Sequence, residues 1–229
     1  MQEQNEREYK KVSDYLLGMI SAKEVSAGGR LPSEREIAAE LGVSRNSVRE
    51  AIRMLDNMGV IECRQGSGNF LAANINRSFR KALDIMFLMH ETDMADICRF
   101  RRSIEKSVFD MAYERRENSP YLARMGEIAA GFESANPERQ SSLDKGFHYM
   151  LVKMAENRFL ETLMDSISDM YQGWIDAVLS DIPEEEKRAL FRAHYAIYKS
   201  LTEGDYRAGI DAVNTHYEII DRVLLGREE

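Results

Sequence analysis

Three of the four histidines in the chain fall on the apolar sides of predicted helices. In "DKGFHYMLVK", Asp144 and His148 are four residues apart, so both lie on one helix face. His194 in "LFRAHYAIYKSL" and His216 in "AVNTHYEIIDRV" each replace a core residue on an apolar stripe. Buried imidazoles and carboxylates need partners. The set therefore predicts a divalent metal site, for which we expect zinc first, with nickel, manganese, iron or cobalt as alternatives.

Other interpretations of these histidines remain open. A single core histidine is more often satisfied by an ordinary hydrogen bond than by a metal. Asp144 and three histidines could also close a purely structural tetrahedral zinc site. A metal with open positions could activate water in an enzyme. No separate general base stands out, so we expect no enzyme activity.

A buried arginine is predicted upstream of the histidines. In "DMADICRFRRSIEKSVFDMA", residues 94, 98, 101, 105, 108 and 112 share one stripe, which places Arg101 on the inward side. A buried guanidinium requires an anion. That anion is either Glu105, one turn later, or the carboxylate of a bound effector. Asn214 and Tyr195 flank two of the histidines and are further candidates for effector contact, although the sequence alone does not settle it.

These residues must be positioned by helices, because no strand signal occurs beyond residue 79. Proline lies near the start of three of the segments, where its missing N–H is harmless. The short connections predict an antiparallel, all-α bundle. Tyr171 and Trp174 are expected in its core or interface. The expected helices cover residues 79–90, 93–116, 120–133, 138–156, 159–179, 184–203 and 205–225.

The N-terminal region has a different pattern. A helix is predicted over 9–22, and a loop over 26–32. Ser33 and Glu36 form a capping box for a short helix that Gly42 ends. A second helix begins after Ser44 and ends at Gly59, and "VIECRQGSGNFLA" then reads as a short hairpin. This order predicts a winged helix-turn-helix.

Charged side chains suit the second of these helices to DNA. Arg45, Arg49 and Arg53 recur every four residues, opposite its apolar face. Arginine reads guanine bidentately, and small polar residues at a helix start contact phosphates or bases. A solvated surface would show the same arginines, but the ordered combination with turn and hairpin favours DNA recognition. The expected DNA-binding residues include Ser44, Arg45, Asn46, Ser47 and Arg49.

Composition limits the function further. The 229 residues carry a net charge of −8, of which residues 1–72 contribute −1, so DNA binding must come from placed arginines. Two cysteines, Cys63 and Cys98, are too few for a disulfide framework. No signal peptide or membrane span is visible, so we expect a cytoplasmic protein without membrane association. We expect domains at 1–72 and 79–229, joined by a linker at 73–78.

The motifs "LPSERE", "LGVSR", "VREA" and "GSGNF" within residues 30–71 resemble the DNA-binding domain of the GntR family of bacterial transcription regulators. The resemblance, which covers about residues 9–72, implies a homodimer on a palindromic operator. It also places Arg35, Arg45, Arg49, Gln65 and Gly66 at DNA. After the second glycine of the hairpin turn, the family usually has threonine or valine, and Asn69 is a mild departure from that pattern.

Residues 79–225 resemble the all-helical FCD effector domain of the FadR subfamily, through "DKGFHYMLVKMAEN", "HYAIYKSLTEGD" and "AVNTHYEII". In metal-binding members, an aspartate, a histidine four later and two further histidines are the ligands. The resemblance therefore implies metal ligation by Asp144, His148, His194 and His216. It disfavours an acyl-CoA effector and implies a small organic acid, such as a sugar acid or hydroxy acid, at or beside the metal, with Arg101 at the effector site. The implied function is a ligand-responsive regulator, more commonly a repressor.

Overall fold

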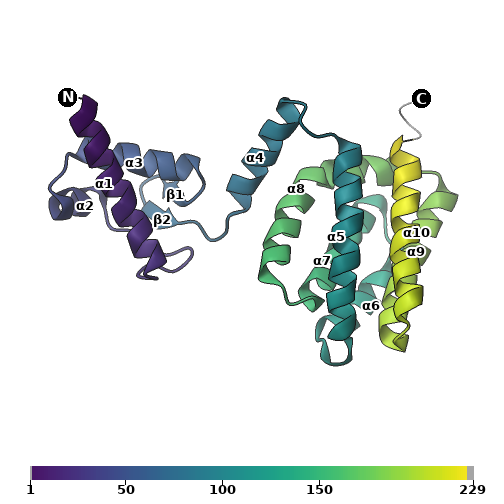
Figure 1. Cartoon of the computed structure of the whole chain (residues 1–229). Coiled ribbons are helices and arrows are strands. Elements are labelled where there is room, and N and C mark those ends of the chain that lie inside the picture. The colour runs from purple at the N-terminus through teal and green to yellow at the C-terminus, as the bar shows by residue number, and fades with distance from the viewer. Residues whose placement is uncertain (1, 226–229) are drawn as a thin grey trace. The chain divides into compact units, whose positions relative to one another are not determined.

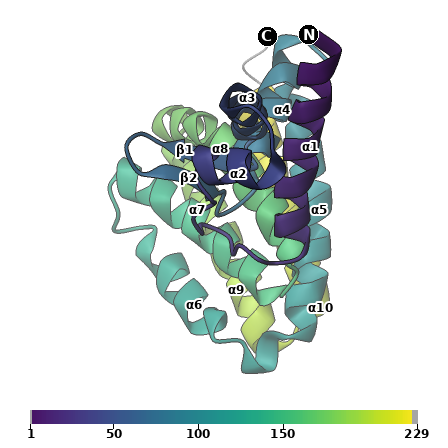
Figure 2. The ribbon, with the colours of Figure 1, turned by 90° about the vertical axis from the view of Figure 1, so that its left-hand side faces the viewer.

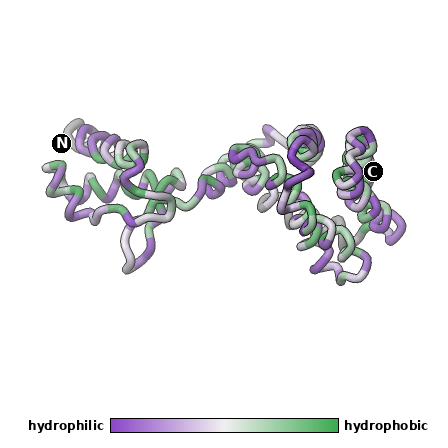
Figure 3. Tube along the Cα trace, turned by 90° about the horizontal axis from the view of Figure 1, so that it is seen from below, coloured by the Kyte–Doolittle hydropathy of each residue, from purple (hydrophilic) through white to green (hydrophobic). Residues whose placement is uncertain are grey.

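The chain forms two compact units, divided between Lys81 and Ala82, in a computed structural model that describes residues 2–225 (Figure 1). Both units are mostly helical. Along the helices, hydrophilic and hydrophobic residues alternate in short stretches (Figure 3), as expected where each helix turns one face to a core. The described residues contain no helix long and apolar enough to span a membrane.

The first unit has the winged helix-turn-helix order that the sequence predicts. The strands pair antiparallel from Ile61↔Leu71 to Arg64↔Gly68. Gly66, in the turn between them, has φ 74°, a left-handed conformation that glycine adopts without steric cost. The elements are α1 (Gln2–Ser21), α2 (Glu34–Leu41), α3 (Arg45–Asn57), β1 (Ile61–Arg64) and β2 (Gly68–Leu71).

Local caps fix the short helices of this unit. Ser33 and Glu36 form the predicted capping box at the start of α2, and Gly42 ends that helix in a left-handed conformation. Ser44 caps α3 by accepting a hydrogen bond from the backbone N–H of Ser47. Helix α1 begins seven residues earlier than expected, because its first residues are polar helix formers without an apolar stripe to detect.

Apolar side chains from all three helices build the core of the first unit. Helix α1 packs along α3, and β1 contributes Ile61. Burial of such side chains supplies most of the stability of a small domain. The fully or nearly fully buried residues are Val12, Leu16, Leu31, Ile37, Val48, Ala51, Ile52, Leu55 and Ile61.

Helix α4 (Asn76–Leu88) contains the division between the two units. It begins inside the stretch for which the sequence suggested a linker. Its first turn is held to the first unit, where Arg77 Nη1 lies 2.9 Å from Asp56 Oδ1. Leu83, further along, joins a small apolar cluster of the second unit with Ile97 and Ile167. Residues 76–78, the second half of the predicted linker, are therefore helical.

The second unit is a bundle whose helices match the predicted bounds within three residues. Helix α10 packs along α9 and α5, and α7 lies against α6 and α8 (Figures 1 and 2). Its core includes Phe109, Phe132, Phe147 and Tyr217. The side chains of Tyr171 and Trp174 lie outside the described residues. The elements are α5 (Met94–Glu114), a short 3-10 helix η1 (Arg116–Asn118), α6 (Tyr121–Gly131), α7 (Pro137–Met154), α8 (Arg158–Asp181), α9 (Glu184–Glu203) and α10 (Tyr206–Leu225).

Candidate metal centre and nucleic-acid interface

Four potential metal ligands converge inside the second unit. Asp144 and His148 come from α7, His194 from α9 and His216 from α10, and one ligand atom of each lies within 4.8 Å of all the others. The histidines present Nε2: that of His194 lies 3.3 Å from that of His148 and 3.1 Å from that of His216. Asp144 Oδ1 is 3.1 Å from His194 Nε2 and 3.7 Å from His148 Nε2. All four residues are buried.

This spacing fits a metal ion. Bonds of about 2.0–2.1 Å to a tetrahedral centre place ligand atoms about 3.3 Å apart, and neighbouring ligands of an octahedral centre lie about 3 Å apart. The four separations given above, 3.1 to 3.7 Å, include the tetrahedral value and come close to the octahedral one. Nitrogen and carboxylate oxygen donors suit zinc and the neighbouring transition metals alike. The arrangement could therefore hold a divalent ion, but its donor atoms do not distinguish zinc from the neighbouring transition metals.

Glu105 of α5 orients one of the ligands. Its Oε1 pairs with His148 Nδ1, and its Oε2 accepts a hydrogen bond from the hydroxyl of Tyr217. A histidine that donates its Nδ1–H to a carboxylate keeps the Nε2 lone pair available for a metal, as ligating histidines commonly do. Phe132 stacks on His194 with ring centroids 4.8 Å apart, and Phe147 meets the same ring edge-on. The imidazole of His194 is thus fixed by packing.

Electrostatics favour ligand-competent protonation states at most of these positions. Burial, assisted by the neighbouring histidines, holds the pKa of His216 well below its ordinary value, and burial also lowers the pKa of His194. Burial would raise the pKa of Asp144, but His148 and His194 outweigh it and hold that pKa well below its usual range. Burial opposes the charged form of His148, yet Glu105 and Asp144 raise its pKa to about 9. A metal would have to displace that proton.

Arg101 lies beside this group, as its position on the stripe predicts. Its side chain is buried, and its guanidinium carbon is 5.7 Å from the ring centroid of Tyr217. The positive charge of Arg101 is among the causes that lower the pKa values of Glu105 and His216. Asn214 is half-buried on α10, and its Oδ1 accepts a hydrogen bond from Arg102 Nη2 at 3.3 Å. Tyr195 is half exposed.

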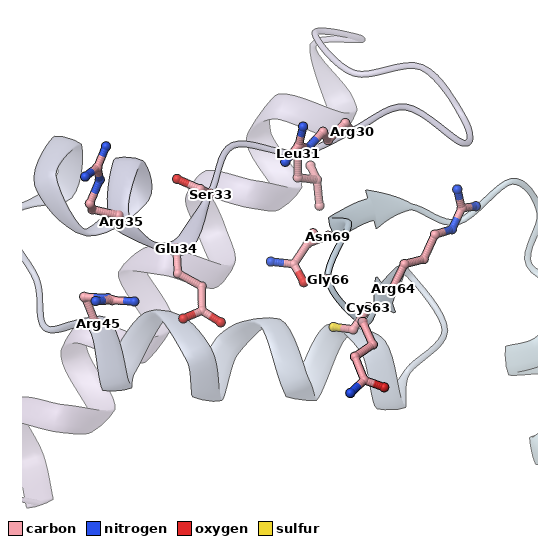
Figure 4. Close-up of a pocket in the computed structure, with 12 residues that line it drawn as sticks. Arg30, Leu31, Ser33, Glu34, Arg35, Arg45, Cys63, Arg64, Gly66 and Asn69 are labelled. Carbon is pink, nitrogen blue, oxygen red and sulfur yellow. The ribbon is translucent and has the colours of Figure 1, made fainter.

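The first unit contains an open cleft of about 490 Å³ between the start of α3 and the hairpin. Figure 4 shows Arg35 and Arg45 on one side of it and Asn69 and Cys63 on the other, with Glu34 between them. Gln65 and Gly66 of the turn also line it, as do Arg30 and Arg64. Several cationic and amide side chains therefore border one concave surface, as a phosphate backbone requires.

The predicted DNA-facing residues of α3 separate into two groups. Ser44, Arg45 and Asn46 are exposed. Arg49 is exposed as well, and its Nη2 lies 3.2 Å from Glu34 Oε2. Ser47 is fully buried, with its hydroxyl bound to Glu8 and Ser44. Because that hydroxyl faces inward, Ser47 is not available for the DNA contact that its sequence position suggested.

Sequence reasoning missed several residues that the fold brings to these sites. The sequence pattern predicts Glu105 only as a partner of Arg101, and it does not single out Tyr217. Both lie beside the histidines because α5 and α10 pack together. Arg30 and Arg64 line the cleft although neither lies on α3. The inward stripe of α5 indicates that Glu105 is buried. The roles of Tyr217, Arg30 and Arg64 depend on tertiary contacts that the sequence pattern does not show.

A winged helix-turn-helix followed by a helical bundle with a buried ligand group is the construction of a ligand-responsive DNA-binding regulator. Comparison with known families agrees. The model for bacterial regulatory proteins of the gntR family matches residues 8–71, and the FCD domain model matches residues 96–219, more than half of the chain. The chain belongs to the GntR family of bacterial transcription regulators and carries an FCD domain. This is a family of DNA-binding proteins rather than enzymes.

Similar proteins cover nearly the whole chain. The HTH-type transcriptional regulator LutR of Bacillus subtilis is 27% identical over 91% of this chain and 97% of its own length. A putative L-lactate dehydrogenase operon regulatory protein of Escherichia coli is 29% identical over 93% of this chain and 84% of its own. The solved structure of Streptococcus agalactiae GntR superposes with a TM-score of 0.69 at 26% identity, covering 93% of this chain and 99% of that one.

Proposed function

We propose that this regulator binds a divalent metal through Asp144, His148, His194 and His216, and a small organic acid beside it. The observation that carries the proposal is the convergence of three Nε2 atoms and one carboxylate oxygen from three helices. Four buried polar residues would not be gathered at metal-ligand spacing without free-energy cost unless they shared a partner. Zinc is our first choice, with nickel, manganese and iron as alternatives.

The effector we propose is a hydroxy acid or sugar acid. Arg101 is a buried cation whose charge acts on His216, and a guanidinium recognises a carboxylate bidentately. Asn214 lies two residues before a proposed metal ligand and would offer its amide to a ligand hydroxyl. A hydroxy acid would thus bind between a metal and an arginine. The Escherichia coli relative, named for an L-lactate dehydrogenase operon, supports this class of effector.

For DNA, we propose a homodimer that reads a palindromic operator, with one first unit on each half-site. The proposed contacting residues are Arg35, Ser44, Arg45, Asn46 and Arg49, with Gln65 and Gly66 on the hairpin. All are exposed, and Arg35, Arg45, Gln65 and Gly66 line one cleft, which supports this assignment. The DNA-binding domain would be residues 1–72, a linker 73–78 and the effector domain 79–229. Because bacterial operator DNA lies in the cytoplasm, we place the protein there.

Effector binding would change operator affinity, and linkage requires operator DNA to change effector affinity by the same factor. We propose that effector binding relieves repression.

Metal analysis of the native protein, followed by a thermal-shift screen of organic acids, tests the proposal. A specific effector should raise the melting temperature of the metal-loaded protein by mass action. The Arg101→Met variant should keep the metal and lose the shift. A metal that is present but never affected by any acid, while His148→Ala unfolds the domain, would instead establish a structural role.

A further inference from the structure

The start of helix α3 is tied to helix α1 by a carboxylate far away in sequence. Glu8 Oε2 accepts a hydrogen bond from the backbone N–H of Ser44 at 3.1 Å and from the hydroxyl of Ser47 at 2.8 Å. Ser44 Oγ in turn lies 2.8 Å from Ser47 Oγ. One acidic side chain therefore holds both serines of the first turn of the helix that presents Arg45.

The neighbouring helix α2 shows what is unusual here. At α2, Ser33 and Glu36 belong to the same helix start, and Glu36 Oε2 accepts from the N-cap N–H at 2.7 Å. The equivalent position in α3 is Ser47, whose hydroxyl cannot reach back as a longer glutamate does. Glu8 supplies the missing carboxylate from another helix. The cap of α2 is local, whereas the cap of α3 is completed by tertiary structure.

The hydrogen bonds of Glu8 to Ser44 and Ser47 are directional, whereas the other contacts between α1 and α3 are largely apolar. Val12 and Leu16 of α1 are buried in the same cluster as Ile52 and Leu55 of α3. Apolar packing tolerates small shifts, whereas hydrogen bonds to a charged group depend on distance and angle. The backbone hydrogen bond from Ser44, followed by that from Ser47, lowers the pKa of Glu8, so the carboxylate is ionised at neutral pH. A negative charge at a helix N-terminus is also favourable.

We propose that Glu8 is a positioning residue for operator recognition: through Ser44 and Ser47 it fixes the first turn of α3, and with it the direction in which Arg45 and Asn46 are presented. The proposal rests on the assignment of α3 as the recognition helix. A rotation of this helix would misalign its contacts to base edges, which carry the sequence information, whereas the attraction of its arginines to phosphates of any sequence depends mainly on charge. Glu8 should therefore control discrimination between sequences more than overall attraction to DNA.

The test compares two duplexes of equal length and composition. One is selected by the wild-type full-length protein from a random-sequence pool, and the other is its scrambled form. In Glu8→Ala, the ratio of the two affinities should fall about tenfold, the size expected for loss of a charge-assisted hydrogen bond. Binding to the scrambled duplex should not weaken, because the lost charge is negative. Glu8→Gln, which keeps an acceptor oxygen for Ser44, should recover part of the ratio.

Tyr15→Phe is the matched control. The Tyr15 hydroxyl donates to Glu40 Oε2 at 2.7 Å, so this variant removes a carboxylate contact between α1 and α2 without touching α3. Its affinity ratio should stay at the wild-type value. An unchanged ratio in both Glu8 variants, whatever their absolute affinities or melting temperatures, would overturn the proposal. If the wild type itself selects no sequence, the assignment of the recognition helix fails instead.

Discussion

The buried histidine group and the arginine cleft use polar side chains in opposite ways. Asp144, His148, His194 and His216 are at most 5% exposed, and each is fixed by neighbours in the bundle. At the start of α3, Arg45 and Asn46 are exposed, and Arg49 is exposed as well although it pairs with Glu34. Buried groups must satisfy one another, because water cannot. Exposed groups gain little from pairing, because water screens them.

This difference bears on what each region can recognise. A group held by buried contacts keeps one geometry, which suits a small ligand or ion whose bond lengths vary by only tenths of an ångström. Long, exposed arginines can change rotamer, which suits a polymer whose sequence and shape vary. If the proposed function holds, the bundle is built before its ligand arrives, whereas the cleft completes its geometry on binding.

Removal of a metal should destabilise the bundle most. At a metal concentration of a thousand times Kd, binding to the native state contributes about 4 kcal/mol to the free energy of unfolding, which corresponds to a fall in Tm of roughly 10 °C after chelation. Calorimetry with and without a chelator measures it. Asp144→Asn should lower the metal content found by elemental mass spectrometry.

His90→Asn provides the control, because His90 is exposed and outside the ligand group, with φ 56° that asparagine tolerates. It should retain the metal and the response to chelator. If the native protein contains no metal and melts at the same temperature with and without chelator, the claim that a metal stabilises the bundle is wrong.

Replacement of one glycine in each unit should show the next largest difference, because the space around the two glycines differs. A Cβ at Gly209 would lie 2.0 Å from Phe109 Cζ and 2.6 Å from Ser200 Oγ, so Gly209→Ala should destabilise the bundle by about 1–3 kcal/mol through overpacking. Gly18, in the last turn of α1, has nothing within 4 Å of its Cβ position. Gly18→Ala should stabilise by about 0.5–1 kcal/mol. Chemical denaturation of both variants checks the pair, and equal effects would contradict the contrast in packing.

Arg45→Ala should weaken binding to the selected duplex by about tenfold, or roughly 1.4 kcal/mol, if it makes a specific base contact. Its melting temperature should be unchanged, because the side chain is exposed. Fluorescence anisotropy titrations provide the measurement. Arg124→Ala, which removes an exposed arginine paired with Glu127 in the second unit, should leave the DNA affinity unaltered. Full affinity in Arg45→Ala would exclude Arg45 from recognition.

The smallest effect concerns the titration of Glu8. Its pKa is lowered, so its contribution to stability is present above the ordinary glutamate value and is lost as the pH falls through the lower folded value. An NMR titration should therefore place the midpoint of Glu8 below that of an unpaired surface glutamate. In Ser47→Ala, one hydrogen bond to the carboxylate is lost, and the midpoint should move up toward the ordinary value. A midpoint at or above the ordinary value would contradict the contact.

Much of this molecule was predictable because its signals are local. The capping box of Ser33 and Glu36 and the turn glycine Gly66 act within a few residues, and the structure confirms both. The apolar stripes predicted the helices of the bundle for the same reason. The hydrogen bond from Ser47 to Glu8 was not predictable, because the two residues lie 39 positions apart in the sequence. The start of α1 was missed because exposed helix formers leave no periodic pattern.

The sequence by itself determined the order of the elements, the family, and which residues lie on the inner faces of their helices. Helical periodicity and caps carry that information along the chain. Only the tertiary structure decided that His194 and His216 meet Asp144 with their Nε2 atoms, that Glu105 orients His148, and that Glu8 caps a helix not its own. A stripe specifies a face, but the distance between two faces depends on how whole helices pack.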